Sequence, residues 1–402
     1  MAVKLLTPAT VPACRDACIE GLQHAARVRD VSVKELMEPY LEDQLKQVLA
    51  RPFSSRPLAE QAGLADTLTF CMEQTPPLVA VDEKVVPILC EALITADQEM
   101  LATGGKNTRA TPALEAVSLA AVRMLAASLA LDSLTMTIPQ ALMPAPVPAN
   151  PGAQPPPAPA PVELRSKAVS VFFLCLIRGR DDVAAPAKKG IQTALDRKNL
   201  PKELLQSSLR PILLNLATYR TLNLPLLNGL ADLLSLLSAW FNKSLGEKLL
   251  EHLERWMYPE RLAAEQTAWK PGEDAKVAAA IIELFHLLPD VAQEFLPRLV
   301  PLVDGLERAL PAVDLPSEVC SILEAPLSKY LCKYSSQSVD YFLDKLSDPQ
   351  QYRRLVSVIA KPEGKELLEE LLKSADKVLA VTFGQRQEPS GSVAGSTVVA
   401  TT

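Results

Sequence analysis

Apolar residues recur every three or four positions along most of this chain, and this spacing constrains the fold more than any other feature of the sequence. Residues at that spacing lie on one face of an α-helix. One such row runs through Leu226, Leu230, Leu233, Leu237 and Trp240. Later rows that we expect to face the core are Val277, Ile281, Phe285 and Leu288, and then Tyr352, Val356 and Ile359. The pattern predicts about seventeen or eighteen helices in an all-α fold.

Local signals mark where these helices begin. Capping-box spacing, in which a serine and a glutamate satisfy first-turn backbone donors from both sides, occurs at Ser32 with Glu35 and at Ser244 with Glu247. The dipeptide Asn228-Gly229 is typical of β-hairpins, but it lies inside a leucine-rich helical pattern without flanking alternation. We therefore interpret it as part of a helix.

The spacing of helix starts indicates how the helices pack. Starts near Pro201, Leu224 and Ser244 place two helices in about 43 residues, which is within the range of HEAT and armadillo units. A helix pair with one wide apolar stripe cannot bury it alone, so successive pairs must stack. The sequence therefore predicts a HEAT/armadillo-like α-solenoid of stacked helix pairs with a Pro-rich disordered insertion.

That insertion divides the chain. Residues 139–161 hold ten prolines and no charge, which excludes a helix and favours an extended linker. We predict N-terminal helical repeats at 11–138, the Pro-rich linker at 139–161, HEAT-like helical repeats at 162–381 and a disordered tail at 382–402. The linker contains P-x-x-P spacings at Pro148–Pro151 and Pro156–Pro159 that fit an aromatic groove. A simple insertion bridging two helices is the preferred interpretation, because no basic residue flanks either motif.

Charge and composition exclude several classes of function. Lys+Arg total 41 against Asp+Glu 47, a net charge of −6, so a general nucleic-acid binder is not expected. Fifteen glycines and few aromatic residues argue against Gly-rich phosphate loops and an all-β fold. One basic cluster stands out, and we interpret it as a solvated helix end in preference to a positive patch: Lys188, Lys189, Arg197, Lys198 and Lys202.

The seven cysteines are scattered and form no C-x-x-C pair, which is typical of a reduced intracellular protein. Cys14 and Cys18 lie one helical turn apart, and we expect them to serve packing and not metal binding. The N-terminus has no apolar run typical of a secretory signal. The apolar stretches 168–177 and 222–241 are expected to be buried helices, so no membrane association is predicted.

Residues for catalysis are sparse. The chain has three histidines, His24, His252 and His286, and none has a partner at H-x-x-x-H or H-E-x-x-H spacing. Gly104-Gly105 before Lys106 is interpreted as a polar link between helices, because no strand precedes it. The sequence therefore predicts no catalytic residue, no cofactor, no metal site and no small-molecule ligand, and hence no enzyme.

Three L-x-x-L-L runs would dock coactivators only if they were exposed. They are Leu230–Leu234, Leu284–Leu288 and Leu368–Leu372. Each lies on a stripe that we assign to the core, so packing is the expected role.

Two stretches resemble a known family. LPKELLQSSLRPILLNLA at Leu200–Ala217 and LNGLADLLSLLSAWFNKSLGEKLLEHLERW at Leu227–Trp256 are similar to the helical-repeat region of the transformation/transcription domain-associated protein family. The resemblance is good from about Arg165 to Leu310 and weaker for Cys14–Leu134 and Ser317–Ala380. The family includes scaffold subunits of SAGA and related histone acetyltransferase complexes, which are atypical pseudokinase relatives of the phosphatidylinositol-3-kinase-related kinases.

The resemblance implies a function that the spacing alone does not. It implies a non-catalytic scaffold segment of a nuclear transcription coactivator, with transcriptional activators and histone acetyltransferase complex subunits as partners. The FAT and kinase-like parts of the family are absent from these residues, so we expect a fragment, a partial gene model or a truncated product. The alternative is a generic HEAT-type adaptor, such as a nuclear transport or phosphatase scaffold.

Overall fold

The computed structural model describes residues 11–103, 111–131, 163–178, 180–196, 202–258, 272–310 and 316–383. These residues form seventeen α-helices and several short 3-10 segments, with no strand among them, so the predicted all-α class is confirmed. Contacts divide the chain into two compact units. The first is residues 1–238 with 267–269, and the second is residues 239–266 with 270–402.

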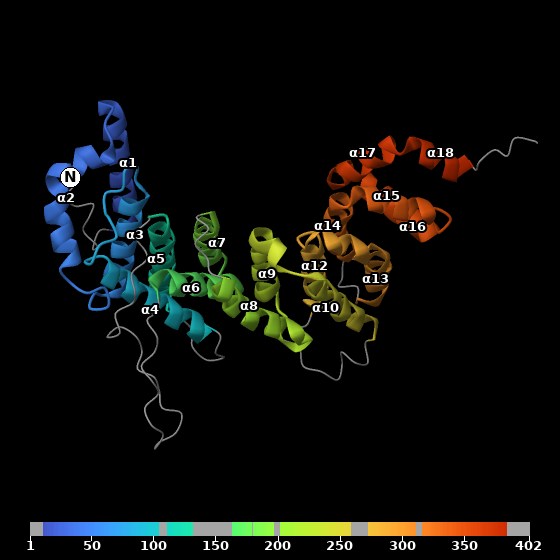
Figure 1. The fold of residues 1–402 in the computed structure, drawn as a ribbon, viewed down its shortest axis with the longest axis horizontal. Coiled ribbons are helices and arrows are strands. Elements are labelled where there is room, and N and C mark those ends of the chain that lie inside the picture. The colour runs from blue at the N-terminus through green and yellow to red at the C-terminus, as the bar shows by residue number, and fades with distance from the viewer. Residues whose placement is uncertain are drawn as a thin grey trace, which may run out of the picture. The chain divides into compact units, whose positions relative to one another are not determined.

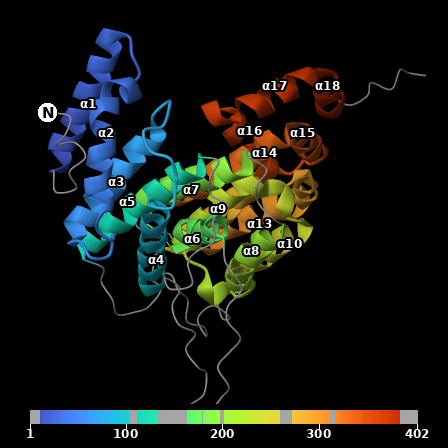
Figure 2. The same ribbon diagram turned by 60° about the vertical axis from the view of Figure 1, so that its left-hand side comes forward.

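The first unit is built from nine α-helices in its described part. They are α1 (Pro12–Arg29), α2 (Val33–Leu49), α3 (Leu58–Glu73), α4 (Val86–Thr103), α5 (Pro112–Leu129), α6 (Leu164–Arg178), α7 (Asp181–Asp196), α8 (Lys202–Ala217) and α9 (Leu224–Leu237), with the 3-10 segment η3 (Tyr219–Thr221) before α9. Helices α3, α5 and α7 lie side by side in one row, and α4, α6 and α8 form a second row (Figure 1, Figure 2). Each helix pair thus covers the next, as an α-solenoid requires.

Helix α9 confirms the leucine row and the interpretation of its glycine. Leu226, Leu230, Leu233 and Leu237 are all buried, whereas Trp240 is 39% exposed because it lies beyond the helix in the 3-10 segment η4 (Ser238–Trp240). The helix begins at an Asn223 cap, whose side chain accepts from the Leu226 N–H at 2.9 Å. Gly229 sits in the middle of the helix against α6.

Two apolar regions of this unit are core helices. The stretch 168–177 lies in α6 and 222–241 contains α9, as predicted. Helix α5 alone among the described helices has the length and hydropathy of a membrane span, and 61% of it is buried within the protein. It packs against α3, α4 and α7, which accounts for its apolar character.

The second unit contains the remaining elements. They are α10 (Lys243–Glu254), η5 (Arg255–Met257), α12 (Asp274–Phe285), η6 (Asp290–Phe295), α13 (Leu296–Ala309), α14 (Pro316–Lys333), α15 (Ser335–Asp344), α16 (Pro349–Ile359), η7 (Pro362–Gly364), α17 (Lys365–Lys373) and α18 (Ala375–Phe383). Helix α12 packs on α14, and α15 packs on α17 (Figure 1). Aromatic rings pack edge to face between α12, η6 and α14. The ring centroid of Phe285 in α12 lies 5.7 Å from that of Phe295 in η6 and 6.2 Å from that of Tyr330 in α14.

Helix starts follow the sequence signals in one case and depart from them in another. The capping box of Ser32 and Glu35 is present with both hydrogen bonds at 3.2 Å. The box predicted at Ser244 is wrong, because α10 begins earlier, at an Asn242 cap that accepts from the Ser244 N–H. Glu247 instead accepts a hydrogen bond from Arg298 Nη1 at 2.6 Å.

The predicted core row of α16 is also wrong. Tyr352 is 53% exposed and Val356 is 41% exposed, whereas Gln351, Leu355 and Val358 are buried. The buried face is therefore one position earlier than the apolar pattern indicates. The cause is polar, because Gln351 Nε2 donates to Asp304 Oδ2 of α13 at 2.7 Å and so belongs in the interior.

Several predicted features lie outside the described residues. They are the Pro-rich linker at 139–161, most of the tail at 382–402, the Gly104–Lys106 link, Arg197, Lys198 and Pro201. The domain boundaries drawn around the linker and tail therefore remain predictions.

Candidate functional site

The three histidines lie on different helices. His24 is exposed on α1, His252 is buried on α10, and His286 is half-buried at the end of α12. Burial lowers the pKa of His286, although the Glu283 carboxylate 3.9 Å from its Nδ1 acts in the opposite direction. In the described part of the chain, no three His, Cys, Asp or Glu side chains are placed to hold a metal ion.

The basic cluster is not gathered into one phosphate-binding patch among the residues described. Lys188 Nζ lies 2.6 Å from the Asp232 carboxylate of α9, and Lys189 Nζ lies 2.9 Å from Glu73 of α3. These pairs join α7 to α9 on one side and, past α5, to the end of α3 on the other. Lys202 is exposed on α8. The two α7 lysines thus serve contacts between helices, which the sequence did not predict.

Two of the three L-x-x-L-L runs are confirmed as core. Leu230, Leu233 and Leu234 of the first run are fully buried. In the second run Leu284 and Leu288 are buried and Leu287 is half-buried. The third run is a correction, because Leu368 and Leu371 are half-buried and Leu372 is 66% exposed. In α17 only Leu367 is fully buried, and Leu372 lies toward solvent.

The described cysteines fall into two groups. Cys71, Cys90, Cys175 and Cys332 are buried, whereas Cys14 is exposed and Cys18 is half-buried on α1. Burial raises the pKa of Cys71 to about 12 and that of Cys90 to about 11, so these thiols stay protonated and unreactive.

A buried polar network joins α13 to α16 in the second unit. Arg354 Nη2 lies 2.6 Å from Asp304 and 2.5 Å from Glu307, and the side chains of Arg354 and Asp304 are 9% and 3% exposed. Burial acts to lower the pKa of Arg354, but the hydrogen bonds that it donates to Glu307 and Asp304 outweigh this effect and raise the pKa. Both carboxylates of α13 are paired with Arg354 of α16, so the network holds these two helices together.

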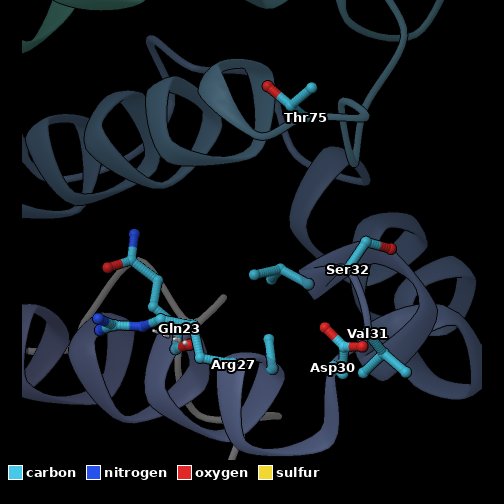
Figure 3. Close-up of a pocket in the computed structure, with 8 residues that line it drawn as sticks. Gln23, Arg27, Asp30, Val31, Ser32 and Thr75 are labelled. Atoms are coloured by element: carbon cyan, nitrogen blue, oxygen red, sulfur yellow. Dashed lines mark hydrogen bonds between the residues drawn. The ribbon is translucent and has the colours of Figure 1, made fainter.

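A cavity of about 720 Å³ opens where α1 turns into α2 (Figure 3). Gln23 and Arg27 project from α1, and Thr75 lies across the opening from them (Figure 3). Asp30 ends α1 in the left-handed conformation at φ 53°, and Ser32 caps α2. Polar groups that line the cavity make hydrogen bonds within their own helices. Arg27 Nε donates to the Gln23 carbonyl of α1 at 3.3 Å, and the Ser32 hydroxyl accepts from the Glu35 N–H at the start of α2.

A larger groove, of about 1040 Å³, is lined by α1, α3 and α5. An ion pair crosses it, with Arg15 Nη2 of α1 2.5 Å from Asp66 Oδ2 of α3. The Arg15 side chain is 7% exposed and that of Asp66 is 26% exposed. Burial raises the pKa of Asp66, and the guanidiniums of Arg15 and Arg123 only partly oppose this. This groove is larger than the cavity at the turn between α1 and α2, and it offers a concave surface on three helices to another polypeptide.

No motif in the sequence indicated this groove. The signal that could have indicated it is the run of small residues at helical spacing, Ala59, Ala62 and Gly63 on α3 and Ala113, Ala116 and Ala120 on α5. Small side chains at positions i, i+3, i+4 and i+7 leave a helix face shallow. Which face is left open depends on tertiary packing, which the spacing does not specify.

Comparison with known proteins gives a consistent family. The family model described as the Tra1 HEAT repeat ring region matches residues 7–400. The SAGA complex/NuA4 acetyltransferase complex subunit TRA1 of Saccharomyces cerevisiae is 28% identical over 378 residues, which cover 91% of this chain and 9% of that protein. The probable transcription-associated protein 1 of Dictyostelium discoideum is 28% identical over 86% of this chain and 7% of its own length.

An animal relative is similar over the same extent. The transformation/transcription domain-associated protein of Homo sapiens is 25% identical over 398 residues, 91% of this chain and 9% of that protein. The chain thus spans less than a tenth of the length of these curated relatives. The match reaches well beyond the stretches in which the sequence resemblance is strongest. Together with the stacked helix pairs, it establishes that this chain belongs to the Tra1 HEAT repeat ring family.

Proposed function

We propose that this chain is a non-catalytic scaffold segment of a transcription coactivator subunit in a nuclear histone acetyltransferase complex. The observation that carries the proposal is the family match over residues 7–400, together with relatives whose names place them in SAGA and NuA4 acetyltransferase complexes. Its partners would be complex subunits and transcriptional activators, bound along the surface of the helix rows. No nucleic acid, membrane or small-molecule ligand is part of the proposal.

The chemistry of the described residues supports binding over catalysis. The histidines lie on three separate helices, and the buried thiols have raised pKa values. Several charged side chains pair between helices, as Arg298 does with Glu247 and Glu254. A solenoid exposes a large surface for its mass, which suits protein recognition.

Affinity purification tests the proposal. The full-length subunit that contains this segment is tagged at its own locus, and co-purifying proteins are quantified by mass spectrometry. Acetyltransferase-complex subunits are expected to be enriched well above an untagged control. Recovery at background, with transport or phosphatase components enriched instead, would support the generic HEAT-type adaptor and overturn the proposal.

A further inference from the structure

The row of helices in the first unit has a gap at its N-terminal end. Helices α3 and α5 are in direct contact, whereas α1 stands away from α3, and the groove of about 1040 Å³ lies between them. The Arg15–Asp66 pair holds α1 across this gap. The groove follows α1 from Val11 to Gln23 and α3 from Leu58 to Gln74, so it runs along the helices. Its shape suits an elongated guest.

Much of the lining of the groove is made of small or apolar side chains. Ala62 and Gly63 of α3 and Ala116 of α5 leave room for a guest backbone to approach closely. Ile19 and Leu119, both half-buried, also line the groove. An amphipathic helix that lays its apolar face into such a groove buries leucine-sized side chains at i, i+3, i+4 and i+7 spacing.

The charges of the groove select the guest. Four carboxylates line it, against the two guanidiniums of Arg15 and Arg123. Asp66 is paired with Arg15, and Glu73 with Lys189. The remaining two, Asp16 and Glu60, have no ion-pair partner in the part of the chain that is described. Both carboxylates line the groove, so it attracts cations and repels acidic segments and phosphates.

We propose that the α1–α3–α5 groove binds an amphipathic helix of a partner protein, with its apolar face in the groove and lysines or arginines against Asp16 and Glu60. The proposal deepens the proposed scaffold function by naming one docking surface and the chemistry of its partner. Peptide binding is measured on the chain itself, and complex membership by co-purification, so either can fail without the other.

Two synthetic peptides of about 18 residues, close to the length of α1, serve as probes. Both carry leucines along one helical face, and the polar face is lysine in one and glutamate in the other. Fluorescence anisotropy measures their binding to the 402-residue chain. The lysine peptide is expected to bind at least about tenfold more tightly than the glutamate peptide.

Two variants locate the binding. Ala116→Phe fills the groove from an exposed position and is expected to weaken binding of the lysine peptide at least about tenfold. Ala185→Phe, at an exposed position of α7 outside the groove, is the matched control and should leave binding unchanged. The double change Asp16→Lys with Glu60→Lys should reverse the preference between the peptides. Equal thermal melts by circular dichroism confirm that the variants fold.

Four results would overturn the proposal. They are no binding of the lysine peptide, equal affinity for both peptides, a preference for the glutamate peptide, and binding that Ala116→Phe leaves unchanged. Self-association of the chain that Ala116→Phe abolishes would assign the groove to a second copy and would also overturn it.

Discussion

Gly229 of α9 faces the carbonyl oxygen of Leu176 in α6 so closely that a Cβ atom on Gly229 would stand 2.1 Å from that oxygen. The Leu176 carbonyl belongs to the backbone, so it cannot move aside as a flexible side chain would. The absence of a side chain at Gly229 is therefore what lets α9 lie against α6, and the close packing of these two helices depends on it.

Gly229→Ala is expected to destabilise the protein by about 1–3 kcal/mol, because the added methyl group forces the two helix backbones apart. Chemical denaturation of the two proteins measures the difference. Gly21→Ala is the matched control, since a Cβ there meets nothing within 4 Å, and it should stabilise by roughly 0.5–1 kcal/mol. Equal effects of the two changes would contradict the helix packing described.

Arg354→Met is expected to lower the free energy of unfolding by about 3–5 kcal/mol, because it leaves the Asp304 and Glu307 carboxylates in the interior without their cation. Arg353→Met, at the adjacent exposed position, should change stability by no more than about 0.5 kcal/mol. Urea denaturation of both variants gives the comparison. A small loss for Arg354→Met would show that the network is open to water.

Glu324 makes the stability of the second unit depend on pH. Burial acts to raise the pKa of Glu324, but the hydrogen bonds from Lys361 and Ser357 outweigh it, so the pKa lies below its ordinary value of 4.5. A carboxyl with a lowered folded-state pKa stabilises the protein above its unfolded-state pKa, and that stabilisation is lost as pH falls through the folded-state value.

The Glu324→Gln variant should therefore melt at a lower temperature than the parent protein at pH 7. This gap in melting temperature should narrow as the pH falls below 4.5. Thermal melts over a pH series measure this gap. Glu363→Gln, at an exposed position, supplies the control, for which the gap should stay flat. A gap for Glu324→Gln that widens toward acid pH would contradict a lowered pKa of Glu324 in the folded protein.

The register of α16 gives a test at two adjacent positions. Leu355→Ala removes a side chain that is 4% exposed and should cost about 2–5 kcal/mol. Val356→Ala removes one that is 41% exposed and should cost less than about 0.5 kcal/mol. Denaturant midpoints decide between the registers, since the row predicted from the sequence requires the opposite order.

The leucine spacing predicted the helices because a long amphipathic helix is stable in water only when its apolar face is buried against a neighbouring helix. It misplaced the buried face of α16 because the choice between two adjacent rows depends on a partner far along the chain. Gln351 is interior there only because Asp304, 47 residues earlier, accepts its hydrogen bond. Spacing within one helix carries no information about such a partner.

The groove between α1, α3 and α5 could not be predicted for the same reason, since it depends on how distant helices pack. The small residues of α3 and α5 are visible in the sequence, but small residues can either let helices touch or leave a face open. Between α3 and α5 they allow direct contact, whereas toward α1 they line a groove. The distinction is set by the position of α1, which the Arg15–Asp66 pair helps to fix. Resemblance to a family indicated a protein-binding role but not this location.

The central claim is that this segment contacts other subunits of an acetyltransferase complex, and cross-linking mass spectrometry on the purified native complex tests it most directly. Lys34, Lys202 and Lys276 are exposed and have no ion-pair partner among the described residues, so they are the reactive positions to follow. The account predicts cross-links from these lysines to acetyltransferase-complex subunits. Cross-links confined to the subunit itself, in a complex that is otherwise intact and well cross-linked, would contradict it.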